Sequence, residues 1–173
     1  MINYNWNLAS GVDVADIVAM AQTHFQFEID NIFTPEPITY ARNLAHCVIN
    51  QFYQPGTQLL TVCRHGNTNK LLAYNWAAGN ERACWSDDYM INVRMVHVDL
   101  SLSNRVRITL IKDMMYQWER FASVNGNRII CSTTMRGDQS GFLELHRRNG
   151  YTIRGSYAYK KLELNPASLS IAK

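Results

Sequence analysis

A chain of 173 residues, 47% hydrophobic and 11% aromatic, is long enough to bury one core and favours a single domain. Its formal net charge of +3 is mild, and the basic residues are mostly scattered among acidic ones, which makes a nucleic-acid-binding protein unlikely as a class. There is no run of about 18 apolar residues, and the first residues do not form a signal peptide. We therefore expect a cytoplasmic protein that does not enter a membrane.

Four cysteines lie 16, 21 and 47 residues apart, and none of them forms a Cys-x-x-Cys pair. This spacing argues against a zinc site and against a thioredoxin-like site, so no metal is expected. Three of the four, Cys47, Cys63 and Cys131, lie in apolar segments. We expect buried free thiols in a reducing compartment.

The first half of the chain alternates between the two main periodicities. Strict alternation of apolar and polar residues predicts a strand over 2–8, and apolar residues at helical spacing predict helices over 13–27 and 37–53. Two apolar strands, 59–64 and 70–77, flank a segment with strong turn residues and are predicted to form a hairpin. The polar stretch that follows them predicts no regular element.

A valine-rich strand over 92–98 runs into a long helix that starts at about 104. Ser103 or Asn104 can cap this helix, and Asn125-Gly126 supplies its end. Its predicted apolar stripe has spacings of 3, 4, 3 and 4 and consists of Ile108, Ile111, Met115, Trp118 and Ala122. A strand that leads into a helix presents free backbone N–H groups at the junction, which can hold a phosphate.

The last part of the chain repeats the same motif on a smaller scale. A strand is predicted over 127–133 and a short helix over 138–148, capped by Asp138 and ended by Gly150. Residues 151–154 and 157–164 are predicted to form two strands, or one strand bent at a glycine.

This mixed order of strands and helices predicts one α/β (α+β) domain. We expect a mixed, mostly antiparallel sheet with helices on both faces over residues 1–164, followed by a flexible tail over 165–173.

The order of elements and the phrase Phe142-Leu-Glu-Leu-His-Arg-Arg-Asn-Gly-Tyr-Thr-Ile-Arg-Gly155 resemble the GNAT superfamily of N-acetyltransferases, especially its phage-encoded members. The order matches over about 1–164 and the motifs over about 93–160. The resemblance implies a GNAT-like domain that binds acetyl-CoA between the strands at Val93–Val98 and Asn127–Thr133. It also implies transfer of the acetyl group to an amine by direct attack.

In the GNAT superfamily, Gln or Arg begins a loop whose small residues let backbone N–H groups approach the pyrophosphate of the cofactor. Here that motif has degenerated, because Ser103 replaces the Gln or Arg, and Val106 and Ile108 replace the small residues. The positive end of the helix dipole should remain, and two arginines add charge to it. The resemblance thus implies a rebuilt phosphate loop made of Ser103, Asn104, Arg105, Val106, Arg107 and Ile108.

The resemblance also implies roles for individual side chains. His146 occupies the position of a family tyrosine that protonates the leaving thiolate, and Gln139 that of an asparagine which bonds a pantetheine amide. The strand Val96-His97-Val98 would pair with pantetheine, and His97 is a candidate base for the amine. The residues alone favour a structural interpretation, in which His146 is a helix-terminal histidine and His97 a hydrogen-bonded sheet histidine. His24, His46 and His65 are predicted to be helix-surface or turn residues.

Two alternatives to an enzymatic function remain open. The degenerate loop is also typical of a GNAT scaffold that has lost catalysis and serves as a phage virion or assembly component, or binds a host protein. The protein would then reside in the virion or the host cytoplasm, with protein partners in place of an amine substrate. A weaker alternative is polyanion binding through Arg94, Arg105, Arg107, Arg147 and Arg148.

Overall fold

The computed structural model describes residues 2–28, 33–155 and 158. In that part of the chain, five strands form one sheet in the order β1-β2-β3-β4-β5. The first three pairs of neighbouring strands are antiparallel, and β4 pairs with β5 in parallel. The strands are β1 (Tyr4–Leu8), β2 (Gln58–His65), β3 (Leu71–Arg82), β4 (Tyr89–Val98) and β5 (Ile129–Ser132).

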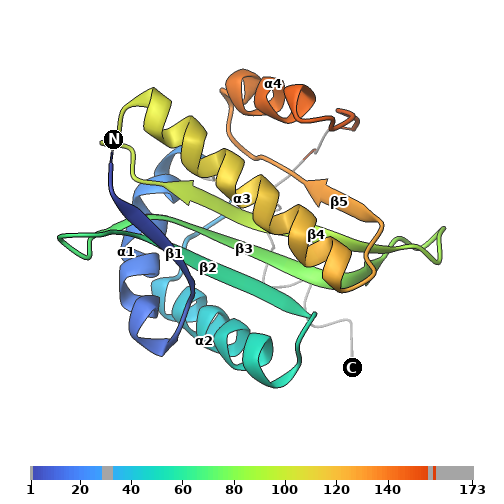
Figure 1. Ribbon diagram of the computed structural model, residues 1–173, viewed down its shortest axis with the longest axis horizontal. Helices are drawn as coiled ribbons and strands as arrows, with labels where there is room; N and C mark the ends of the chain where they lie inside the picture. The colour runs from blue at the N-terminus through green and yellow to red at the C-terminus, as the bar shows by residue number, and fades with distance from the viewer. Residues whose placement is uncertain (1, 29–32, 156–157, 159–173) are drawn as a thin grey trace, which may run out of the picture.

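Helices cover both faces of this sheet (Figure 1). A short 3-10 turn, η1 (Gly11–Asp13), leads into α1 (Val14–Glu28), and α2 (Pro37–Tyr53) packs beside α1 on one face. On the other face lies α3 (Asn104–Val124), and α4 (Ser140–Arg148) follows β5. The α+β class, the single domain and the mixed sheet with helices on both faces confirm the sequence-based prediction. Among the described helices, none is long and apolar enough to cross a membrane.

The core between the sheet and α3 corrects one detail of the predicted helix. Its buried stripe consists of Leu110, Met114, Met115, Trp118 and Ala122. Ile108, predicted to belong to this stripe, is 46% exposed. Successive residues are about 100° apart around a helix, so Ile108 and Leu110 lie at opposite edges of the apolar arc. The helix is rotated towards Leu110, and Ile108 therefore faces solvent.

The second core lies between the sheet and the pair α1 and α2. Ile17 and Leu44 are fully buried in it, together with Tyr74 from β3. The side chain of Gln51 ties α2 to the sheet, because its amide donates to the Ala9 carbonyl at 2.6 Å and accepts the Leu60 N–H at 2.9 Å. Buried polar groups on this face are thus paired.

Helix ends follow the local sequence. Both α3 and α4 stop one residue before an asparagine–glycine pair, and Gly126 and Gly150 adopt φ of 70° and 85°. Glycine takes this left-handed conformation without a steric cost. At the start of α4 the capping position is Gln139 and not the predicted Asp138.

The structure differs from the sequence-based prediction at the end of β3 and after α4, and it places Trp85. β3 extends to Arg82 because it keeps pairing with β4, through Glu81 and Arg82, beyond its apolar segment. Trp85, considered for the edge of the core or a cleft, is 85% exposed. Residues 151–154 are not a strand in the structure, and the predicted strand at 157–164 and the tail at 165–173 lie outside the described residues, Ala158 excepted.

Candidate functional site

The two parallel strands at one side of the sheet diverge in the middle of β4. Their register runs from Met90 opposite Ile129 to Val93 opposite Ser132, where β5 ends. From there to Val98, the described strand that pairs with β4 is β3, on its other side. We call residues 94–98 the open edge of β4.

Backbone groups of this edge point away from β3, towards the side on which β5 has already ended. We call this side of the open edge the gap. The N–H of Asp99 donates to Leu72 of β3 at 2.8 Å. Because inward and outward residues alternate along an antiparallel strand, Val96 and Val98 turn their N–H and C=O groups away from β3. The Val98 carbonyl accepts the His24 Nε2–H at 2.9 Å. The open edge therefore directs the backbone groups of Val96 and the N–H of Val98 towards the gap.

Five residues separate the end of β4 at Val98 from the first residue of α3, Asn104. Ser103 is its N-cap and makes no side-chain capping bond, and the first helical bond runs from the Arg107 N–H to the Ser103 carbonyl at 3.0 Å. The N–H groups of the first three helical residues, Asn104 to Val106, have no partner within the helix. Together with the helix dipole they form a site that favours an anion.

Two arginines add to this charge in different ways. Arg105 is exposed, whereas Arg107 is half-buried and its Nε is a buried donor without a partner among the described residues. A terminal nitrogen of Arg107 donates to the Asn104 side chain. Val106 packs against the core under α3, so its bulk is directed away from solvent. The rebuilt loop thus places two guanidinium groups at the start of the helix.

His146 is buried on the α3 face of the sheet, where α4 meets the end of β5. Its Nδ1 lies 2.9 Å from the Phe142 carbonyl, and its Nε2 lies 3.0 Å from Ser132 Oγ. A carbonyl only accepts, so Nδ1 carries the proton and Nε2 accepts from the serine hydroxyl. Burial lowers the pKa of His146 despite the bond to Phe142, because it disfavours the charged form of the ring.

Aromatic rings hold this histidine in place. Its ring centroid lies 6.2 Å from that of Trp118, 4.2 Å from Phe142 and 4.8 Å from Tyr151. Ser132 is the last residue of β5 and is half-buried. Sequence reasoning missed it, because no motif marks a serine at the end of a short apolar strand. Gln139, predicted to contact the cofactor, is the exposed N-cap of α4.

His97 lies on the opposite face of the sheet and is 1% exposed. Its Nδ1 lies 2.5 Å from the Tyr74 hydroxyl, and its Nε2 lies 2.9 Å from a Glu28 carboxylate oxygen. Because a carboxylate only accepts, Nε2 carries the proton and Nδ1 accepts from Tyr74. Both ring nitrogens are thus engaged. Burial lowers the pKa of His97 even though Glu28 opposes that shift.

His24, predicted to lie on the helix surface, is instead 2% exposed. Its ring stacks on that of His97 with centroids 4.2 Å apart and an angle of 7° between the planes. With its Nε2–H bonded to Val98, its Nδ1 accepts from the Arg136 guanidinium. The prediction failed because α1 turns this residue into the sheet. His46 is exposed as predicted, and His65 ends β2 and bonds the turn after it.

Glu28 lies at the centre of these groups. Arg136 Nε donates to its carboxylate at 2.9 Å, opposite the bond from His97. Desolvation alone would raise the pKa of Glu28, but His24, His97 and Arg136 outweigh it and hold that pKa well below its ordinary range. We call His24, Glu28, Tyr74, His97 and Arg136 the closed histidine cluster.

Three members of the cluster are of the kind that binds metals. Ligand atoms of His24, Glu28 and His97 lie within 4.8 Å of one another. Each histidine nitrogen already has a hydrogen-bond partner, and the guanidinium of Arg136 supplies the positive charge that the carboxylate needs. The hydrogen-bond donors and acceptors of these three side chains are therefore satisfied by groups of the protein itself.

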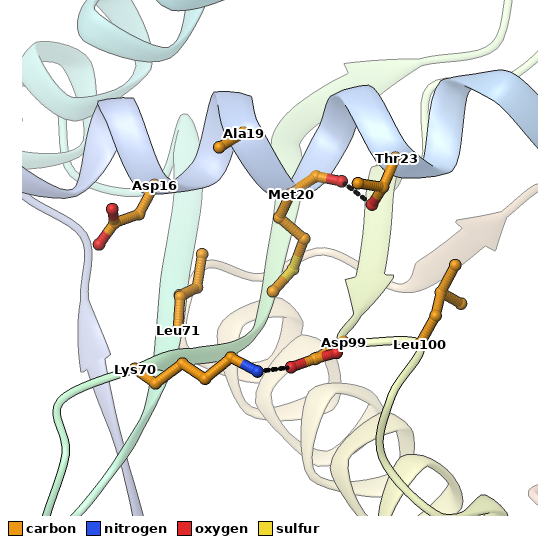
Figure 2. Close-up of a pocket in the computed structure, with 8 residues that line it drawn as sticks. All are labelled: Asp16, Ala19, Met20, Thr23, Lys70, Leu71, Asp99 and Leu100. Carbon is orange, nitrogen blue, oxygen red and sulfur yellow. Dashed lines mark hydrogen bonds and ion pairs between the residues drawn. The ribbon is translucent and has the colours of Figure 1, made fainter.

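A hollow of about 590 Å³ lies between α1, the start of β3 and the residues that follow β4 (Figure 2). Lys70 Nζ and Asp99 Oδ2 pair across it at 2.6 Å, and Thr23 donates to the Met20 carbonyl at 2.7 Å. Asp16, also in its wall, pairs with Arg64 at 2.8 Å. None of the predicted site residues lines this hollow, and its charged groups are already neutralised.

Basic residues outside the loop are mostly paired with carboxylates. Arg94 contacts Glu81 at 2.8 Å, and Arg147 and Arg148 both contact Glu144, at 2.5 and 2.9 Å. Among the five arginines considered for a polyanion, only Arg105 and Arg107 lie together at a helix N-terminus.

No protein-family model matches the sequence, and no curated protein does so either. Solved structures do match. An aminoglycoside N-acetyltransferase, AAC(6')-Iy in complex with CoA, is similar with a TM-score of 0.69 and 8% identity, over 95% of this chain and 97% of that chain. A predicted acetyltransferase with acetyl-CoA from Clostridium acetobutylicum gives 0.65 and 13%, over 95% and 97%.

A third structure is the aminoglycoside antibiotic 6'-N-acetyltransferase AAC(6')-Ih from Acinetobacter baumannii. Its TM-score is 0.61 at 13% identity, over 94% of this chain and 100% of that chain. At sequence identities this low, the structural similarity shows a shared fold alone. The chain therefore has the GNAT-like fold that the order of its elements predicts, whereas a place in the phage-encoded branch stays a prediction.

Proposed function

We propose that this protein is an N-acetyltransferase that moves an acetyl group from acetyl-CoA to an amine. The observation that carries this proposal is the meeting of two features at one end of β4. The open edge of the strand offers backbone groups that no other described strand pairs with, and the first turn of α3 offers N–H groups without a partner within the helix, together with two arginines. The fold is shared with acetyltransferase structures that contain CoA or acetyl-CoA.

The chemistry of the cofactor suits these two features. Pantetheine carries two amides, which can pair with the backbone of Val96 as an added strand would. The pyrophosphate and the 3'-phosphate suit the N-terminus of α3, where guanidinium groups bind phosphate well. Arg107 carries a buried donor without a described partner in this region, and a phosphate oxygen would satisfy it.

The reaction needs proton transfer near the sulfur. A leaving thiolate must be protonated and an attacking amine must lose a proton. His146 lies at the end of β5, beside the gap, whereas both nitrogens of His97 are engaged in the closed histidine cluster. We therefore place the proton transfer on His146 and leave to His97 the backbone contact only.

Thermal unfolding with and without acetyl-CoA tests the proposal. Acetyl-CoA at about 100 times its dissociation constant stabilises by about 2.7 kcal/mol, which raises the midpoint by about 5–10 °C in a domain of this size. Arg107→Gln should reduce this shift, and Arg120→Gln, an exposed arginine at the far end of α3, should not. No shift at millimolar acetyl-CoA would contradict the proposal and favour the non-catalytic scaffold.

Thiol release in the presence of amines tests the chemical step. A small panel is enough to start: an aminoglycoside, a peptide with a free N-terminal alanine and a polyamine. The first two correspond to the names of similar structures. Formation of the acetylated amine, identified by mass, is the expected result. Tight acetyl-CoA binding without turnover on any amine would restrict the proposal to cofactor binding.

A further inference from the structure

We propose that the acceptor amine is an α-amino acid with an apolar side chain, held by Glu81 and Arg94 on the face of the sheet opposite His146. The inference rests on the proposed function, because it needs a thioester in the gap beside β4. It goes beyond that function by naming the substrate class and by giving Glu81, Asn92 and Arg94 a binding role. We call these three residues the charged patch.

The charged patch lies where β4 and β5 separate. Val93 is the last residue of β4 that pairs with β5, and Arg94 is the first residue of the open edge. In the pairing with β3, Arg94 is an extra residue between the partners of Trp76 and Ala77. Such a bulge redirects a side chain of the strand, and the Arg94 guanidinium lies over the Trp76 ring, 5.5 Å from its centroid. Trp76 belongs to the core under α1 and α2, so Arg94 faces that side of the sheet.

His146 borders the gap at the same level, from the other face. Its partner Ser132 is opposite Val93, which directly precedes Arg94. The gap thus has the proton-transfer group on one face of the sheet and the charged patch on the other.

Hydrogen bonds hold the carboxylate of Glu81 in place and leave part of its capacity free. Arg94 donates to Glu81 Oε1 at 2.8 Å, and the Asn92 side chain donates to Oε2 at 3.1 Å. Each oxygen has one of these donors, whereas an ionised carboxylate offers about four lone-pair sites. The side chains of Glu81 and Arg94 are 29% and 44% exposed. A small ligand therefore has access to both charges.

These charges are complementary to those of an amino acid. An α-amino acid carries an ammonium group and a carboxylate on one carbon atom, and Glu81 and Arg94 present the opposite charges side by side. A guanidinium group suits a carboxylate, because its planar fork of N–H groups matches the two oxygens. Binding exchanges one internal ion pair for two ion pairs with the ligand, so no charge is left unpaired.

Other amines fit the charged patch less well. A polyamine or an aminoglycoside brings several positive charges to a site whose own formal charges cancel, and one of them would face Arg94. A peptide N-terminus lacks the carboxylate and gives Arg94 no new partner. The charges therefore favour a different acceptor from those in the names of similar structures.

Uncharged side chains border the patch on the same face. Met95 is half-buried and packs against the core under α1 and α2. Cys131 of β5 is opposite Asn92 and is also half-buried. Burial raises the pKa of the Cys131 thiol, and the negative charge of Glu81 adds to this shift. An apolar side chain of the acceptor suits these neighbours better than a charged one, which would lose its hydration there.

The transfer balances without another reagent. The amino acid arrives as an ammonium ion and gives one proton to solvent, and Glu81 then accepts an N–H of the neutral amine. The nitrogen attacks the thioester carbonyl carbon, and the C–S bond breaks. The proton that the nitrogen loses passes to His146 Nε2 and then to the thiolate, which leaves as CoA. The other product is the N-acetyl amino acid.

Three acceptors with the same side chain test the inference: leucine, leucinamide and isopentylamine. Leucine has the carboxylate, leucinamide has a neutral amide in its place, and isopentylamine has neither. Rates are measured with saturating acetyl-CoA and compared at equal concentrations of neutral amine, because the pKa values of the three amines differ. Leucine should have a kcat/KM about 10–100-fold higher than the other two, as expected for one charge-assisted contact.

Variants locate this contact. Arg94→Gln should lower kcat/KM for leucine by about 10–100-fold and leave the value for leucinamide nearly unchanged. Glu81→Gln should lower the values for all three amines. Arg82→Gln is the matched control, because Arg82 is exposed at the end of β3 and pairs with Asp87 instead, and it should change none of them.

A double variant separates binding from folding. Glu81→Arg combined with Arg94→Glu keeps an ion pair between the two positions and exchanges its charges. A purely structural pair predicts transfer to leucine at the wild-type rate, whereas the binding role predicts that the preference for leucine is lost. The thermal shift with acetyl-CoA, measured on every variant, shows that each is folded and binds the cofactor.

The two proposals fail in different ways. If acetyl-CoA binds and another amine is acetylated while leucine has no advantage over leucinamide, the amino-acid site is wrong and the transferase stands. A preference for leucine that persists in Arg94→Gln or in the double variant also overturns the site. If acetyl-CoA binds and no amine, leucine included, is acetylated, the site is overturned and only cofactor binding stands. If acetyl-CoA does not bind, the proposed function falls and the acceptor site falls with it.

Discussion

Two buried histidines lie on opposite faces of the same sheet, and the difference between them lies in their partners. His97 is enclosed by α1 and β3 and makes hydrogen bonds through both nitrogens to Glu28 and Tyr74. His146 is equally buried, but its Nε2 faces a half-buried serine at the end of a strand. Burial therefore does not distinguish a structural histidine from a chemically available one, and the direction of the hydrogen bonds does.

Charge separates the two sites as well. The closed histidine cluster contains a carboxylate and a guanidinium, so opening it would leave an unpaired charge in a largely dry region. The pair of Ser132 and His146 is neutral, and a proton can move within it without creating such a charge outside the pair. We therefore expect the first site to contribute to stability and the second to reactivity.

The matched substitutions His146→Gln and His97→Gln should give the largest contrast. His146→Gln removes the proton-transfer group and should reduce the rate of acetyl transfer to an amine by about 10²–10³-fold. His97→Gln should lower stability and leave the transfer rate of the folded protein unchanged. Transfer rates and urea unfolding, measured on both variants below their unfolding midpoints, check this contrast. A loss of transfer in His97→Gln without a loss of stability would reverse the assignment.

Glu28→Gln should lower the free energy of unfolding by about 2–3 kcal/mol near neutral pH. The neutral amide leaves the Arg136 guanidinium without its counter-charge and returns only one acceptor oxygen to the cluster. Urea unfolding of this variant and of Glu36→Gln, an exposed glutamate at the start of α2, makes the comparison. Equal stabilities for the two variants would mean that the cluster contributes little.

Acid should reduce the difference between the wild type and Glu28→Gln. The folded-state pKa of Glu28 lies below its ordinary value of 4.5, so its stabilising contribution is complete above that pH and is lost as the pH falls further. Unfolding curves for both proteins from neutral to acidic pH should therefore converge in the acidic range. A difference that stays constant down to strongly acidic pH would show that the charge of Glu28 is not the cause.

The pH profile of acetyl transfer should give the smallest effect. Protonation of His146 removes the lone pair that can accept the proton of the amine, so the rate falls on the acid side. Because burial lowers the pKa of His146, that fall should occur below the ordinary histidine pKa of about 6.5. Initial transfer rates at a series of pH values, with acetyl-CoA saturating and the concentration of the neutral amine held constant, locate it. A fall above that value would indicate another titrating group.

Much of the fold follows from local patterns in the sequence. α2 has the predicted bounds of 37–53, and α3 ends before the predicted glycine. The predicted site residues are more mixed. The distance to Gly150 singles out His146 in the sequence, whereas nothing in the sequence singles out its hydrogen-bond partner Ser132. A sequence gives residue types, whereas reactivity depends on which atom of each side chain faces which partner.

The amino-acid sequence by itself determined the order of the elements, their faces and their ends, because periodicity and turn residues act over a few neighbours. Only the tertiary structure decided that His24 stacks on His97, that Arg136 reaches Glu28 across 108 residues, and that Ser132 meets His146. These contacts depend on how α1 is rotated against the sheet and where β5 stops pairing with β4. Such long-range packing is a property of the assembled chain, and no local pattern contains it.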